Sequence, residues 1–164
     1  MLFPRFAQSA AVLFLLVIGF AAPIHAQNNK QVISGTWYED RAAMLVSTSN
    51  NSVTLTFAQT PTNQFLNITN VSCNITTTSS QIINVMTLVA GTTSGAFDLN
   101  RPYEIKGNVT PETSGTSKTY SIVTNQIYFK FGPGRFPSIV IDTESTGASS
   151  ILARCVIVGN LTDN

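Results

Sequence analysis

Beyond its first thirty residues, the chain consists of short stretches of alternating apolar and polar residues, separated by clusters of Gly, Pro, Asn and Ser. None of these stretches has the 3.6-residue period of an amphipathic helix. Strands with one buried face alternate with a period of two, and Gly, Pro and Asn favour turns between them. The pattern therefore predicts an all-β fold, an antiparallel, jelly-roll-like β-sandwich of about nine or ten strands. An up-and-down β-barrel is the alternative.

The predicted strands follow from the phase of the apolar residues. They are Val32–Tyr38, Ala42–Ser47, Val53–Ala58, Phe65–Thr76, Gln81–Val89, Tyr103–Val109, Thr119–Phe131, Phe136–Asp142 and Ile151–Leu161. Two of them, Gln81–Val89 and Ile151–Leu161, are apolar on both faces, as strands between two layers are. We expect Trp37, the only tryptophan, to pack in the core, and Thr110–Lys118 to form an exposed loop.

The apolar phase changes inside Phe65–Thr76, near Thr69-Asn70. A β-bulge inserts one residue and turns the following side chains to the other face, so the change of phase predicts a bulge at this point. Cys73 then points into the core.

The amino terminus has the pattern of a secretory signal peptide. Arg5 gives a positive start, Ala10–Ala22 is apolar, and the sequence becomes polar from Gln27. We predict cleavage between Ala26 and Gln27, which makes 1–26 the signal and 27–164 a single β domain. The apolar stretch is shorter than the roughly 20 residues that span a bilayer, and no later segment is long enough. The protein is therefore expected to be secreted or periplasmic.

The two cysteines, Cys73 and Cys155, predict one disulfide, because exported chains fold in an oxidising compartment. Cys155 lies at the centre of the last predicted strand, on the same face as Ala153 and Ile157. We expect the bond to tie this closing strand across the core to the bulged strand that carries Cys73.

After removal of the signal, eight Lys and Arg balance eight Asp and Glu, and no basic cluster remains. Electrostatic binding of nucleic acid needs such clusters, so a nucleic-acid partner is not expected. Six Asn-x-Ser/Thr triplets begin at Asn50, Asn67, Asn70, Asn74, Asn108 and Asn160. Their number is close to what the Asn, Ser and Thr content gives by chance, and we interpret them as compositional.

The predicted mature chain lacks the residues that most kinds of catalysis require. The only histidine, His25, is removed with the signal, so Ser-His-Asp and Cys-His sites have no base, and zinc or copper has no histidine ligand. No phosphate-binding Gly-rich motif occurs. We therefore predict a non-enzymatic protein without cofactor or metal. A carboxylate-dependent glycosidase, using pairs such as Glu39-Asp40 or Asp142 with Glu144, is a weaker alternative. Asp142-x-Glu144 and Asp98-x-Asn100 are weak calcium patterns.

The most distinctive local sequence is Tyr128–Pro137, YFKFGPGRFP. Its Gly-Pro-Gly centre is a turn signal, because Pro presets φ and Gly accepts positive φ. Exposed aromatic and Arg side chains often dominate interfaces. Tyr128, Lys130, Arg135 and Phe136 are thus the candidate contacts for a protein or glycan partner. The competing interpretation is a tight hairpin whose Phe side chains belong to the core.

Ser34–Glu39, SGTWYE, resembles the first-strand Gly-x-Trp motif of lipocalins, and its Gly-Thr-Trp-Tyr also opens avidin-type barrels. The resemblance implies a barrel with a cavity for a small apolar ligand near Trp37. It covers six residues, the further tryptophans of avidin-type sites do not occur, and no helix follows the strands. We assign no family on this basis, and a ligand-binding barrel remains the alternative function to a binding or envelope-associated module.

Overall fold

A computed structural model describes residues 28–46, 51–78, 80–96, 98–105, 110–144 and 150–163. These residues form ten strands and no helix. Within the same ranges, no helix is long and apolar enough to cross a membrane. The predicted signal peptide and its cleavage site, Ala26 and Gln27, lie outside the described residues.

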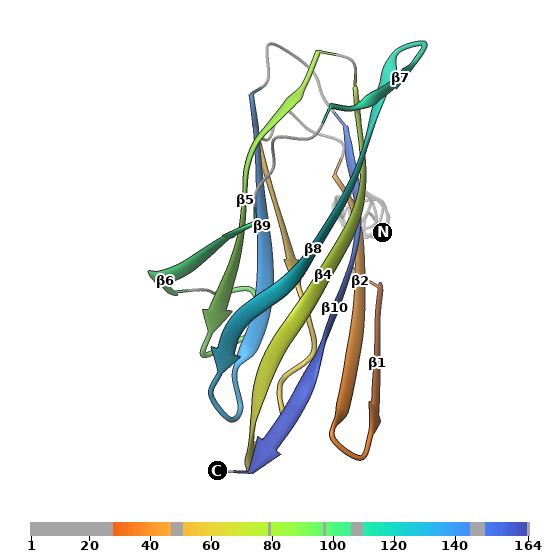
Figure 1. Ribbon diagram of the computed structural model, residues 1–164. Coiled ribbons are helices and arrows are strands. Elements are labelled where there is room, and N and C mark those ends of the chain that lie inside the picture. Colours follow the sequence, from red (N-terminus) through yellow and green to blue (C-terminus); the bar gives the residue numbers. More distant parts are fainter. Residues whose placement is uncertain are drawn as a thin grey trace, which may run out of the picture.

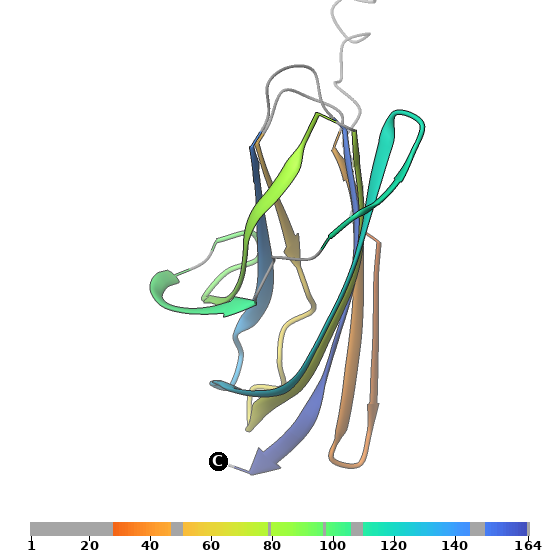
Figure 2. The same cartoon turned by 45° about the horizontal axis from the view of Figure 1, so that its top comes forward.

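The strands form two antiparallel sheets that lie face to face as two layers (Figures 1 and 2). The six-stranded sheet has the order β1 (Asn28–Ser34), β2 (Trp37–Val46), β10 (Ile151–Asp163), β4 (Gln64–Thr78), β8 (Ser117–Phe131) and β7 (Glu112–Ser114). The four-stranded sheet has the order β3 (Ser52–Thr56), β9 (Phe136–Glu144), β5 (Ile82–Gly91) and β6 (Asp98–Ile105). Each sheet ends in edge strands, which a closed barrel does not have. The predicted antiparallel sandwich is therefore confirmed, and the alternative barrel is not formed.

The core lies between the sheets and follows the period-two pattern. On β4, β8 and β10, alternate side chains are buried, and β5 lies between β9 and β6 as a central strand. The largest buried side chains are Tyr38, Tyr120, Phe57, Phe131, Leu55, Leu66, Ile68, Ile75, Met86, Leu88, Ile105 and Ile127. Burial of this apolar area is the main favourable contribution to folding.

The predicted bulge is confirmed at Thr69. In the pairing of β4 with β10, Ile68 faces Gly159 and Asn70 faces Val158, so Thr69 is the inserted residue. The bulge brings the two backbones so close that a Cβ on Gly159 would overlap the carbonyl oxygen of Asn67. Only glycine fits at this position.

The first predicted strand is wrong in its boundaries, and so is the expected burial of Trp37. Gly35 adopts a φ of 59°, and a tight turn at Gly35-Thr36 separates β1 from β2. Because Trp37 opens β2 in the phase opposite to Tyr38, its side chain faces outward and is 45% exposed, whereas Tyr38 is fully buried. The predicted loop Thr110–Lys118 is exposed, but it contains a hairpin of β7 and the start of β8.

The disulfide between Cys73 and Cys155 is confirmed, but its predicted path across the core is wrong. Cys155 on β10 pairs directly with Cys73 on β4, and their Cα atoms are 4.1 Å apart. The two strands are neighbours in one sheet, and β10 is hydrogen-bonded on both sides, to β2 and β4. The last strand therefore lies inside the six-stranded sheet, and the bond fastens this interior rather than joining the two layers.

Candidate functional site

A hollow of about 240 Å³ lies where the end of β8 meets the ends of β5 and β6. We call it the basic hollow. Its lining residues are Ala90, Asp98, Arg101, Phe129, Lys130, Phe131, Gly132 and Arg135. Arg101 and Arg135 are its cations and Asp98 is its carboxylate; Lys130 borders it, but alternation along β8 directs the Lys130 side chain to the outer face of the sheet, opposite to Phe129 and Phe131. The hollow therefore combines positive charge with an aromatic floor.

The turn that carries Arg135 is held firmly by a neighbouring loop. Thr60 is 1% exposed; its hydroxyl donates to the carbonyl of Gly132 at 3.0 Å and accepts from the amide of Arg135 at 2.9 Å. The amide of Thr60 donates to the carbonyl of Arg135 at 2.8 Å, and the amide of Gly134 donates to Pro61 at 3.1 Å. These four bonds fix the backbone that presents Arg135, so little order has to be imposed on it when a ligand binds.

Aromatic rings support two of the cations. The Arg101 guanidinium lies 5.3 Å from the centroid of the Phe129 ring, and the Lys130 ammonium lies 3.9 Å from that of Phe65. Phe129 also contacts Tyr103 and Phe131 edge-to-face, with centroids 6.0 and 4.8 Å apart. Cation–π contacts place a cation without neutralising it. The aromatic rings thus hold Arg101 on the inner face of β8 and Lys130 on its outer face.

The four residues predicted from YFKFGPGRFP separate in the structure. Lys130 and Arg135 line the basic hollow. Tyr128 is 87% exposed and shares the outer face of β8 with Lys130. Phe136 is half-buried at the start of β9, where it pairs with Gly91.

Sequence reasoning missed Arg101. It lies on β6, about thirty positions before Lys130 in the chain, and only the packing of β6 beside the end of β8 brings them together. No local signal could have identified it, because the alternation pattern says which face a residue occupies and not which strand lies beside it.

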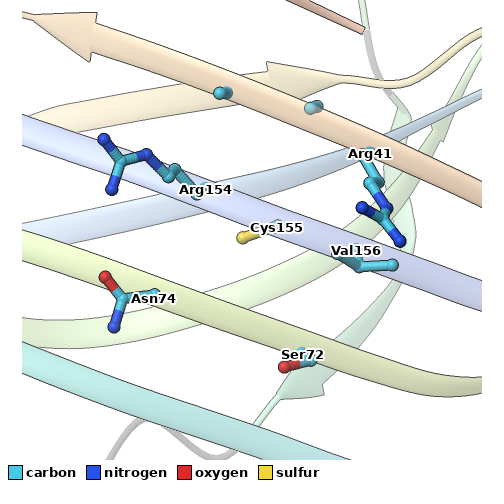
Figure 3. A pocket seen from close by; sticks show the side chains of 8 residues that line it. Arg41, Ser72, Asn74, Arg154, Cys155 and Val156 are labelled. Carbon is cyan, nitrogen blue, oxygen red and sulfur yellow. The ribbon is translucent and has the colours of Figure 1, made fainter. Parts of the chain in front are cut away.

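A second hollow, of about 350 Å³, lies on the outer face of the six-stranded sheet (Figure 3). We call it the outer hollow. Arg41, Ala42, Ala43, Ser72, Asn74, Arg154, Cys155 and Val156 line it. It is open to solvent rather than internal, and Trp37 is not among its lining residues, so it is not the apolar cavity that a lipocalin-like barrel requires.

The predicted carboxylate pair Glu39-Asp40 is divided between two faces of β2. Glu39 faces outward and binds Arg41, with 2.6 Å between Oε1 and Nη2. Asp40 is fully buried; its Oδ2 accepts from the Ala58 amide at 2.7 Å and from the Tyr38 hydroxyl at 3.4 Å, and its Oδ1 has no partner among the described residues. Burial raises the pKa of Asp40, and burial likewise raises that of Tyr38. Two carboxylates on opposite faces of a strand cannot act on one substrate.

Candidate metal ligands do not gather in the described part of the chain, where no group of three or more His, Cys, Asp and Glu side chains could hold an ion. Asp98, from one of the weak calcium patterns, lines the basic hollow together with Arg101 and Arg135.

No protein-family model matches the chain, and no curated protein matches its sequence.

Proposed function

We propose that this protein is an exported, non-enzymatic binding module that holds an acidic glycan through the basic hollow. The observation that carries the proposal is that Arg101 and Arg135 line one hollow with Asp98 as its single carboxylate, while Lys130 adds a third cation at its outer rim. The signal-like amino terminus and the disulfide support an exported location, where acidic polysaccharides occur. The loss of His25 with the signal supports a binding role over histidine-dependent catalysis.

The charges suit a carboxylate or sulfate. Arg presents a planar fork of donors that binds such groups with two parallel hydrogen bonds, and Lys adds a point charge. The backbone at Arg135 is held by Thr60 and the guanidinium of Arg101 rests on Phe129, so the backbone of one cation and the charged group of another are already positioned. Affinity gained in this way costs little conformational entropy.

The size of the hollow favours a sugar over a protein surface. Stable protein interfaces bury about 800 Å² on each partner around an apolar centre. The basic hollow measures about 240 Å³, and the large apolar side chains exposed near it, Leu99 on β6 and Tyr128 on β8, stand singly. The exposed ring of Tyr128 beside Lys130 provides a flat face against which the apolar side of a sugar can pack.

Isothermal titration calorimetry with oligogalacturonate tests the proposal, with the fully methyl-esterified oligomer as the uncharged control. We expect the acid to bind and the ester not to, with affinity falling as salt rises. Arg135→Gln and Arg101→Gln should each weaken binding about tenfold, which corresponds to about 1.4 kcal/mol.

Lys118→Gln is the matched control, because Lys118 lies near the opposite end of β8 and donates to the Gln81 carbonyl. It should leave the affinity unchanged. Equal binding of the ester, or full affinity in both arginine variants, would refute the proposal.

A further inference from the structure

The outer hollow is bracketed by two cations. Arg154 on β10 pairs with Ala43 on β2, and Arg41 on β2 pairs with Val156, so the two arginines are diagonal neighbours on one sheet face. Diagonal neighbours lie about 7–8 Å apart. Figure 3 shows their guanidinium groups at opposite ends of the hollow, with Asn74 beside the Arg154 end and Ser72 beside the Arg41 end. Ala43 leaves the space between them open.

The two arginines differ in whether a carboxylate neutralises their charge. Glu39 binds Arg41, with its Oε1 2.8 Å from Nε. Arg154 is exposed and forms no salt bridge within the described residues. The outer hollow therefore offers Arg154 as its uncompensated cation.

We propose that one acidic glycan chain binds along the outer face of the six-stranded sheet, with one acid group at Lys130, on the outer rim of the basic hollow, and another at Arg154 in the outer hollow. The inference rests on the proposed function. It adds a second contact, a direction for the chain, and a minimum ligand length.

The surface between the two hollows is uncharged; β10 contributes Val156 and Val158 to it, and β4 contributes polar side chains. β4 presents Asn74, Ser72, Asn70 and Asn67 in succession on this face, and Asn67 pairs with Lys130 of the basic hollow. The amides form cross-strand bonds: Asn70 donates to Asn125, Asn74 donates to Ser121 at 3.5 Å, and Asn67 donates to Thr162 at 3.1 Å. An amide has two N–H donors and an oxygen with two acceptor sites, so each retains capacity for sugar hydroxyls.

The wider charge of this face also favours an anion. By strand register, the outward charged side chains are the cations Lys30, Arg41, Lys130 and Arg154 and the carboxylates Glu39 and Glu112. Glu39 is engaged by Arg41, and Glu112 lies on the edge strand β7. No carboxylate therefore lies on the path along β4 and β10 between Arg154 and Lys130.

The spacing sets the ligand length. From Arg154 to Asn160 is six residues along β10, or about 20 Å at 3.3 Å per residue, and Lys130 lies two strands across, about 10 Å at the usual strand spacing. The two sites are thus about 22 Å apart. An oligomer that spans this distance makes its second contact within the complex, at an effective concentration that can reach the millimolar range.

Calorimetry with digalacturonate and decagalacturonate tests the inference. We expect wild-type protein to bind the decamer at least tenfold more tightly than the dimer. Arg154→Gln should remove most of this gain and leave the affinity for the dimer unchanged. Lys30→Gln is the matched control, because Lys30 is an exposed cation of the same sheet that lies off the path, on edge strand β1.

The outcomes separate the two proposals. If neither oligomer binds wild-type protein, the proposed function fails and this inference fails with it. If both bind but Arg154→Gln retains the full affinity for the decamer, the inference alone is overturned. Equal weakening by Arg154→Gln and Lys30→Gln would also overturn it, because general charge attraction would then explain the effect.

Discussion

Removal of the Cys73–Cys155 disulfide should cost the protein a large part of its stability. The bond closes a loop with a sequence separation of 82 residues. In the chain-entropy model, a loop of this length restricts the unfolded chain by about 4.5 kcal/mol at 25 °C. Single domains are stable by about 5–15 kcal/mol, so the loss would be a substantial fraction of the total.

The position of the bond sharpens this expectation. Cys73 and Cys155 are buried, and β4 and β10 pair along almost their whole length without it. The bond is therefore not needed to define the register in the folded state. Its contribution should arise in the unfolded state, where it keeps distant parts of the chain together.

Urea unfolding of oxidised and reduced wild-type protein measures the effect, since reduction leaves both sulfur atoms in the core. We expect a fall of about 4–5 kcal/mol in unfolding free energy. The urea midpoint should fall by roughly 2 M, and the m-value should be higher for the reduced protein, whose unfolded state exposes more surface. The double variant Cys73→Ala/Cys155→Ala should be less stable still, because it also loses buried atoms.

A difference below about 1 kcal/mol between oxidised and reduced protein, with equal m-values, would show that the cross-link does not stabilise the fold through the unfolded chain. Strand pairing and core packing would then hold the sheet without help from the cross-link.

Two further predictions concern other buried positions. Because burial raises the pKa of Asp40, its stabilising contribution is complete at pH values below the unfolded-state pKa and is lost as pH rises through the folded-state pKa. Across this range the unfolding free energy of the wild-type protein should fall by about 1.4 kcal/mol for each unit of pKa shift, whereas that of Asp40→Asn should not. Urea unfolding at a series of pH values measures both, and equal pH dependence in the two proteins would contradict the prediction. Gly159→Ala should lower the unfolding free energy by about 1–3 kcal/mol, because its Cβ would overlap the Asn67 carbonyl. Asn160→Ala is the control, since Asn160 is exposed, and it should leave the unfolding free energy unchanged. An unchanged value for Gly159→Ala as well would contradict the prediction and show that the bulge can relax.

The strand pattern of this protein follows from local sequence to a large extent. Ile127, Phe129 and Phe131 alternate with Tyr128 and Lys130, and the structure buries the first three and exposes the other two. The bulge at Thr69 was visible as a change of phase. Both succeed because a strand displays its two faces with a fixed period of two, whatever lies beside it.

The error at Trp37 shows where the same rule fails. The alternation continues through Gly35-Thr36, so the sequence reads as one strand with Trp37 on its apolar face. The chain instead turns there, with Gly35 at a φ of 59°, and β2 begins with Trp37 directed outward. Turn formation depends on the gain from pairing β1 with β2, which a single-strand pattern does not contain.

Local sequence was enough to predict an all-β chain with one disulfide, the faces of most strands, and the Gly-Pro-Gly turn that presents Arg135. These features depend on neighbours a few residues apart, or on a cysteine pair with a single possible partner. Three features instead depend on how the strands assemble: Arg101 lies beside Arg135, Arg154 lies diagonal to Arg41, and Cys73 and Cys155 belong to adjacent strands. Strand order arises from contacts between distant segments, because it is chosen by how all the apolar faces can be buried together.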